Sequence, residues 1–156
     1  KQVDFFFFGD AVAPNLPSHS TSLIAAQSLG HLDDSQLRLL LTQLDLVVVP
    51  SRQENLAQIA LEAQACGTAV IVSDNTGLES ALVPGGGWTF ANGSPSDLAA
   101  VIEEALRDHA EVKVRGQTAR EGVWRLFSEE AVVAQYVSHF RALRNCTSFP
   151  NSCEPS

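Results

Sequence analysis

Two carboxylates stand close together in the segment PSRQENLAQIALEAQACGTAVIVSD, which runs from Pro50 to Asp74. Glu54 precedes an apolar stretch that is predicted as a helix from Leu56 to Cys66, and Glu62 lies in the middle of that stretch. A charged side chain is costly to remove from water unless another group pairs with it. Glu62 therefore either occupies a narrow solvent-exposed face of the helix or binds a partner from outside the chain.

The spacing of the two carboxylates limits what they can bind together. Glu54 and Glu62 are separated by about two helical turns, roughly 10 Å at ~1.5 Å per residue. Two acceptors at that separation suit one elongated, hydroxyl-rich ligand, whereas a single metal ion needs ligands that converge within a few ångströms. Simpler interpretations stay open: Glu62 faces solvent beside Gln58, and Glu54 complements the positive end of the helix dipole.

The elements that must position these residues alternate along the chain between short apolar runs and helical patterns. The expected strands are Val3–Phe8, Leu23–Leu29, Leu46–Pro50, Ala69–Asp74 and Trp88–Phe90. The expected helices begin at Asp33 or Asp34 and cover Leu56–Cys66, Ser94–Arg107, Val112–Phe127 and Ser128–Arg144. Continuous apolar strands that alternate with helices predict an α/β fold whose parallel sheet is covered on both faces.

Ligands of such sheets bind beyond the carboxyl ends of the strands. That rule selects Gly9–Asp10, Ser51–Asn55 and Ser73–Leu78, of which the second contains Glu54. Asp33 and Asp34 resemble a metal-binding acidic pair, but a helix cap is the favoured interpretation. The aromatic side chains of Trp88, Trp124 and Phe127 are predicted to belong to the core.

Length and charge exclude several classes of protein. The chain has 156 residues, enough for one domain with a core, and a net charge of −8. It has no stripe rich in Lys or Arg, which argues against a nucleic-acid partner and a polybasic membrane anchor. No apolar stretch approaches the roughly 18 residues of a membrane-spanning helix. Three cysteines do not make a disulfide framework.

The Glu-x7-Glu pair inside the Pro50–Asp74 segment resembles the donor-site signature of retaining GT-B glycosyltransferases. The upstream segment LGHLDDSQLRLLLTQLDLVVVPS and the downstream segments SDNTGLESAL and NGSPSDLAAVIEEAL are similar to the neighbouring parts of those enzymes. The resemblance runs from about Phe5 to Phe140. It implies a Rossmann-like three-layer parallel sheet, the C-terminal donor-binding domain of the GT-B fold without its first strand. Residues 1–144 would form that domain and residues 145–156 a polar tail.

The resemblance also implies a donor site. Glu54 matches the catalytic glutamate that contacts hydroxyl groups of the donor sugar, and Glu62 matches the glutamate that binds the ribose hydroxyls of the nucleotide. The other donor-binding positions that it implies are Asn55, Leu56, Gly30, His31, Leu32, Ser51, Arg52, Thr76 and Gly77. Asn55 and Leu56 would place backbone amides near the sugar or phosphates, and the base would rest near His31. Arg52 could contact a phosphate, but pairing with a nearby carboxylate is its favoured role.

The sequence departs from the family pattern in the glycine-rich loop. Members usually have two glycines and then a glutamate, but here Thr76 replaces the first glycine, and the acid falls at Glu79 with Ser80 at the expected place. The family's phosphate-binding Arg and Lys, and its N-terminal acceptor-binding domain, precede any residue present. The resemblance implies a retaining hexosyltransferase that functions in the synthesis of polysaccharides or glycoconjugates. Its acceptor would be a saccharide or a lipid-linked molecule, and we expect it to need no metal or other cofactor. As this fragment we expect it to be inactive.

The expected partners are a nucleotide-sugar donor and the N-terminal acceptor-binding domain, with no nucleic acid. Without the first strand, we expect Phe5–Phe8 to pair with Leu46–Val49 and the fragment to form a homodimer through exposed apolar surface. The expected location is cytoplasmic, peripheral at the inner face of the membrane in a full-length protein. The alternative function is a stand-alone, non-catalytic module that binds a nucleotide sugar or another protein.

Overall fold

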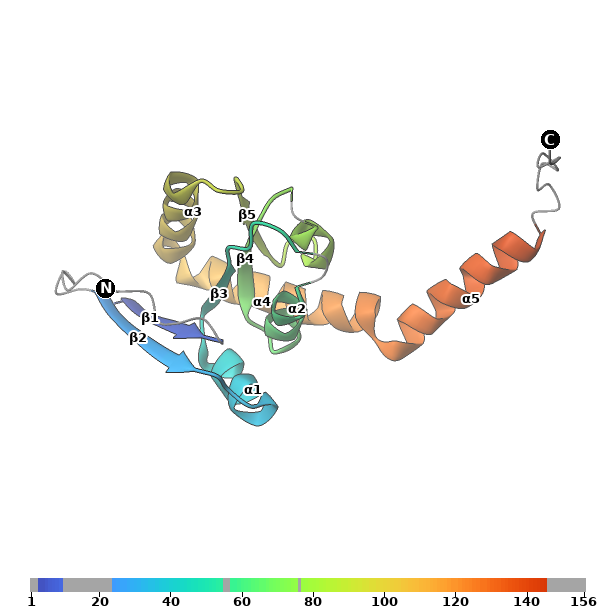
Figure 1. Ribbon diagram of the computed structural model, residues 1–156, viewed down its shortest axis with the longest axis horizontal. Coiled ribbons are helices and arrows are strands. Elements are labelled where there is room, and N and C mark those ends of the chain that lie inside the picture. Colours follow the sequence, from blue (N-terminus) through green and yellow to red (C-terminus); the bar gives the residue numbers. More distant parts are fainter. Residues whose placement is uncertain (1–2, 10–23, 55–56, 76, 146–156) are drawn as a thin grey trace, which may run out of the picture. The chain divides into compact units, whose positions relative to one another are not determined.

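The computed structural model describes residues 3–9, 24–54, 57–75 and 77–145. They belong to two units, Lys1–Leu44 and Asp45–Ser156. The predicted α/β alternation is confirmed, with parallel strands followed by helices in both units (Figure 1).

The first unit contains a parallel pair of strands and one helix. Strand β1 (Val3–Phe8) pairs with β2 (Ile24–Gly30), and helix α1 (Asp34–Gln43) follows. The prediction of a sheet covered on both faces is wrong for β1, because none of its residues is buried and Phe6 and Phe7 are each 38% exposed. Burial of both faces needs a covering layer on each, and α1 is the single helix among the described residues of this unit.

The predicted pairing between Phe5–Phe8 and Leu46–Val49 is also wrong. β1 hydrogen-bonds to β2 in a two-stranded sheet, whereas Leu46–Val49 belongs to a separate three-stranded sheet. β2 is the next strand along the chain, so pairing with it closes a shorter loop than pairing with Leu46–Val49 would.

The second unit is built on a sheet of strand order β3-β4-β5 (Figure 1). β3 (Leu46–Val49) and β5 (Gly87–Phe90) flank β4 (Ala69–Ser73), and both pairings are parallel. Every residue of β4 is buried, as the unbroken apolar run predicts for a central strand.

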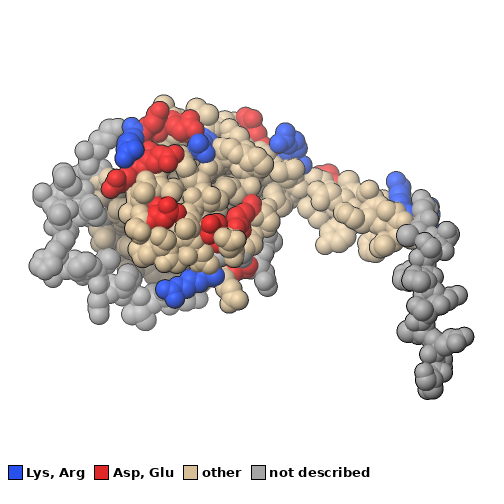
Figure 2. All heavy atoms as spheres, turned by 90° about the horizontal axis from the view of Figure 1, so that it is seen from above, with Lys and Arg blue, Asp and Glu red and all other residues tan. Residues whose placement is uncertain are grey.

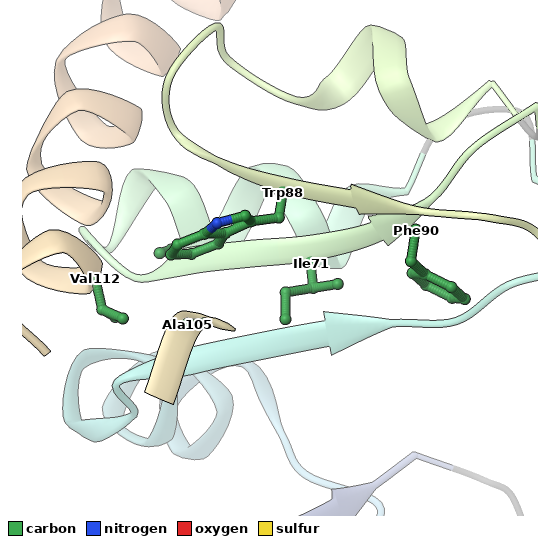
Figure 3. Packing of buried hydrophobic residues seen from close by; sticks show 6 residues of the cluster. Ile71, Trp88, Phe90, Ala105 and Val112 are labelled. Carbon is green, nitrogen blue, oxygen red and sulfur yellow. The ribbon is translucent and has the colours of Figure 1, made fainter. Parts of the chain in front are cut away.

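Helices cover both faces of this sheet. On one face, side chains of β4 and β5 pack against α3 (Pro95–Arg107) and the start of α4 (His109–Phe127) (Figure 3). The buried members of this cluster are Ala69, Ile71, Trp88, Phe90, Ala105 and Val112. Val70 and Val72 point to the opposite face, where α2 (Gln58–Ala65) and the 3₁₀ helix η1 (Leu78–Ala81) pack. The predicted three-layer arrangement is thereby confirmed for the second unit.

Helix α2 begins later than predicted. Its first helical residue is Gln58, and the preceding Ala57 has an extended backbone with φ −76° and ψ 91°. The apolar pattern already begins at Leu56, before the first helical residue, so a helix start placed from the pattern alone comes too early. The end agrees with the prediction, because Gly67 adopts the left-handed conformation with φ +87°. Glu54 consequently precedes the helix and lies in the connection that follows β3.

The last described helix, α5 (Glu129–Asn145), carries no residue classed as buried among those whose side chains are described. Its exposed large apolar side chains are Val133, Tyr136, Val137, Phe140 and Leu143. Trp88 is buried as predicted, whereas Trp124 is 63% exposed and Phe127 37% exposed, so their assignment to the core is wrong. No helix of the described chain is both long enough and apolar enough to cross a membrane.

Close packing between α4 and the turn before β4 depends on Gly116. A Cβ atom at this position would lie 2.2 Å from the carbonyl oxygen of Gly67 and 3.3 Å from the amide nitrogen of Ala69. Neither backbone atom can move without displacing the buried strand that follows.

We expect Gly116→Ala to lower the free energy of unfolding by about 1–3 kcal/mol, because the new methyl group forces α4 away from the sheet. Gln117→Ala, at an exposed position of the same helix, is the control and should change stability by less than about 0.5 kcal/mol. Urea unfolding followed by circular dichroism measures both variants. Equal stability of the two would contradict the close packing.

Candidate functional site

The carboxyl ends of β3, β4 and β5 lie at one edge of the second unit's sheet, and hydrogen bonds tie the loops that leave them. The Ser73 hydroxyl donates to the Ser51 carbonyl at 2.5 Å. The Asn92 side-chain amide donates to the Arg52 carbonyl at 3.1 Å, and its backbone amide donates to the Asp74 carboxylate at 2.8 Å. Segments 50–54, 74–75, 77–79 and 91–94 therefore form one connected structure, here named the carboxyl-end rim.

The loop between β4 and η1 is closed by its own carboxylate. Asn75 and Gly77 both have positive φ, +54° and +88°, and their backbone amides donate to Glu79, the second at 3.2 Å. The Ser80 hydroxyl donates to the Gly77 carbonyl at 2.6 Å. Gly77 suits its position because side chains disfavour that backbone conformation. The displaced acid noted in the sequence thus stabilises the loop that carries it.

Glu54 and Glu62, the two carboxylates that opened the analysis, differ in their surroundings. Glu54 is half-buried in the connection after β3, next to the rim residues Ser51 and Arg52. Glu62 is exposed on α2, while its neighbours Ala63 and Gln64 are buried. Glu62 therefore lies on a solvent-exposed face of α2, and its contact with a ligand stays a prediction. Its carboxylate stays hydrated and can be reached by a ligand from solvent.

The remaining predicted site residues fall into three groups. Arg52 is exposed, and no described carboxylate forms a salt bridge with it, so the predicted ion pair is not found there. Asn55, Leu56 and Thr76 lie outside the described residues. Gly30, with φ +66°, the exposed His31 and the half-buried Leu32 belong to the first unit. Their contact with a nucleotide base stays a prediction.

Asp33 is a helix cap, as favoured over a metal site. Its carboxylate accepts from the Ser35 hydroxyl at 2.6 Å and from the Gln36 amide at 2.9 Å, while the Gln36 side chain accepts from the Asp33 amide at 3.0 Å. These hydrogen bonds, that from Ser35 first, hold the pKa of Asp33 below its ordinary value. Nowhere in the described ranges do three His, Cys, Asp or Glu side chains gather to hold a metal ion.

Asn92 belongs to the carboxyl-end rim, although the sequence did not single it out for the candidate site. It follows β5 as Ser51 follows β3, so the rule of the carboxyl ends, applied to the third strand, would have found it. On the face shown in Figure 2, Lys and Arg side chains lie among Asp and Glu and form no basic stripe.

Comparison with protein families places most of this chain in a known group. The family model described as "Glycosyl transferases group 1" matches residues 23–122. The glycogen synthase of Mycobacterium tuberculosis H37Rv is 37% identical over 102 residues, which cover 64% of this chain and 24% of that protein. The D-inositol 3-phosphate glycosyltransferase of Gordonia bronchialis is 32% identical over 102 residues, 65% of this chain and 22% of that protein. The chain thus spans about a quarter of these relatives' length.

Solved structures share the fold. The sucrose-phosphate synthase from Thermosynechococcus elongatus superposes with a TM-score of 0.67 at 32% identity, over 76% of this chain and 30% of that one. HepE of Anabaena, solved in complex with UDP-glucose, gives a TM-score of 0.63 at 21% identity, over 78% and 33% of the two chains. The second likeness is one of fold alone.

The cap at Asp33 should be visible in a pH titration. Because its pKa is lowered in the folded state, its contribution to stability is present above the unfolded pKa and is lost as pH falls through the folded value. We expect Ser35→Ala to raise the pKa of Asp33 toward the ordinary value, as measured from its carboxyl ¹³C shift. Ser138→Ala, on α5, is the control and should leave it unchanged. A pKa of Asp33 at its ordinary value in the wild-type chain would contradict the cap.

Proposed function

This chain belongs to the family of group 1 glycosyl transferases, and we propose that it is the donor-binding part of an enzyme that transfers a sugar from a nucleotide sugar to a saccharide or lipid-linked acceptor. The observation that carries the proposal is the position of Glu54 on the carboxyl-end rim, at the edge where parallel sheets bind ligands. Names such as glycogen synthase and sucrose-phosphate synthase support a role in saccharide synthesis.

In this proposal the two carboxylates hold different parts of the donor. Glu54, half-buried after β3, accepts hydrogen bonds from hydroxyl groups of the sugar. Glu62, exposed on α2, accepts from the two ribose hydroxyls. A carboxylate has two oxygens and accepts charge-assisted hydrogen bonds, which suits it to neighbouring hydroxyl groups.

The rim supplies the polar groups around the sugar and phosphates. Ser51, Arg52 and Gly77 lie on the rim, where Arg52 extends into solvent and can reach a phosphate. Asn55, Leu56 and Thr76 complete this set in the proposal. That Gly30, His31 and Leu32 contact the base stays a prediction from the sequence. We propose residues 1–144 as the donor-binding domain, followed by the tail 145–156.

The finer chemistry is part of the proposal. The transfer is of the retaining hexosyl type, and its acceptor-binding domain and phosphate-binding Arg and Lys belong to other parts of a longer polypeptide. Stabilisation of the leaving phosphate requires such groups, so we expect no transfer by these 156 residues alone. We propose that donor binding needs no divalent cation, since the separation of Glu54 and Glu62 suits one elongated ligand better than a single ion.

We expect Glu62→Ala to weaken binding of a nucleoside diphosphate about ten- to a hundredfold, the worth of a charged hydrogen bond of about 1.5–3 kcal/mol. The measurement is calorimetry with UDP, ADP and GDP and their sugars, with EDTA present to test independence from metal. Glu103→Ala, which removes an exposed carboxylate from α3, is the matched control and should bind as wild type. Unchanged binding by Glu62→Ala would overturn the ribose assignment.

The apolar side chains of α5 favour a second candidate function, that of an interaction module. Tyr136, Phe140 and Leu143 are 63%, 67% and 65% exposed. A shallow hollow on one face of this helix is lined by Glu130, Val133, Ala134, Val137, Ser138 and Arg141. Glu130 and Arg141 mark its opposite ends, so in an antiparallel pair the acidic end of one copy would meet the basic end of the other. The partner proposed here is a second copy of this chain.

Sedimentation at increasing concentration tests that pairing. We expect the wild-type chain to dimerise and the double variant Val133→Gln, Val137→Gln, at two positions that line the hollow, to weaken the dimer by about tenfold or more, because apolar area is lost from the contact. Gln135→Ala changes an exposed polar position of the same helix and should not alter the dimer. A wild-type chain that stays monomeric at high concentration would contradict the proposal.

A further inference from the structure

Gln64 is a polar side chain with no exposed surface, and neither the spacing of acids nor the family resemblance singled it out. It is fully buried in α2, on the side that packs against the sheet and η1. Its Nε2 donates to the Ala60 carbonyl at 2.9 Å and to the Ala81 carbonyl at 2.7 Å, while its Oε1 accepts from the Val83 amide at 2.9 Å. Both amide hydrogens and the oxygen are thus used.

These hydrogen bonds join two parts of the second unit that are distant in sequence. One end is α2, which carries Glu62 two residues before Gln64. The other end is η1 and the residues that follow it, where Leu78 and Val83 are buried. At about 3.6 residues per turn, side chains two apart point to nearly opposite sides of a helix. Exposed Glu62 and buried Gln64 fit that geometry.

An amide is the side chain that this position requires. The Ala81 carbonyl needs a donor and the Val83 amide needs an acceptor, and both are reached from one side chain. A methionine would fill a similar space yet leave both buried backbone groups without this partner. A purely space-filling role would have been met by an apolar side chain, as at Ala60 and Ala63 on the same face.

We propose that Gln64 is a positioning residue, which fixes the loop of Gly77 and Glu79 relative to Glu62 on α2. The inference rests on the proposed function, in which Glu62 holds the ribose and the rim holds the sugar. The contacts of one donor molecule with Glu62 and with the rim then depend on the distance between α2 and the rim, which the Gln64 side chain sets. Loss of its hydrogen bonds should disturb sugar binding more than nucleotide binding.

The test compares UDP with UDP-glucose, the ligand of HepE, for wild type and Gln64→Met. We expect the variant to change UDP affinity by less than about threefold and to lower UDP-glucose affinity relative to UDP by about tenfold. Gln117→Met, an exposed glutamine of α4, is the matched control and should leave both affinities unchanged. Equal losses for both ligands, or no loss, would assign Gln64 to stability alone and overturn the inference.

A second measurement needs no variant. Hydrogen exchange of the Val83 amide, which donates to Gln64, reports whether the loop tightens when ligands bind wild type. UDP-glucose should slow this exchange more than UDP does at equal saturation, and equal protection would overturn the inference. Absence of binding by either ligand in wild type is a different result, because it removes the proposed function and the inference together.

Discussion

The complete burial of β4 is the constraint on which the rest of the second unit depends. This strand lies between β3 and β5, and its side chains point alternately toward α3 and α2, so no residue from Ala69 to Ser73 meets solvent. The chain can become polar only beyond Ser73, whose hydroxyl already bonds to the loop after β3. The carboxyl-end rim follows from that arrangement, because loops leaving adjacent parallel strands emerge at one edge.

The same constraint explains why the central elements could be predicted from the sequence. Leu46–Val49 and Ala69–Ser73 could be predicted as strands because apolar residues dominate both runs. The start of α3 could be predicted because Ser94, a helix-capping residue, stands before Pro95. An apolar run does not specify which other strand it pairs with. β1 contains four consecutive phenylalanines, yet it pairs with β2 in a two-stranded sheet and stays partly exposed, because burial depends on which layers cover a strand. Trp124, on helix α4, is likewise apolar and yet exposed, so the sequence did not reveal its lack of burial either.

Glu54 and Glu62 could be selected from the sequence as candidates for the site, because their charge and their separation along the chain are visible there. The site was not predictable where side chains bind backbone groups. Gln64 and Asn92 act on carbonyls and amides of residues far along the chain, and backbone groups are the same at every position of a sequence. Side-chain amides of this kind, buried in Gln64 and exposed in Asn92, become recognisable only when their backbone partners are known.

The central claim is that the carboxyl-end rim and α2 bind a nucleotide sugar. Titration of the ¹⁵N-labelled chain with UDP-glucose, followed by amide chemical shifts, tests it most directly. The account predicts saturable shifts at Ser51, Arg52, Glu54, Glu62, Gly77 and Asn92, with α5 unaffected. Saturable shifts confined to α3, α4 or α5, or no shifts at millimolar ligand, would contradict it.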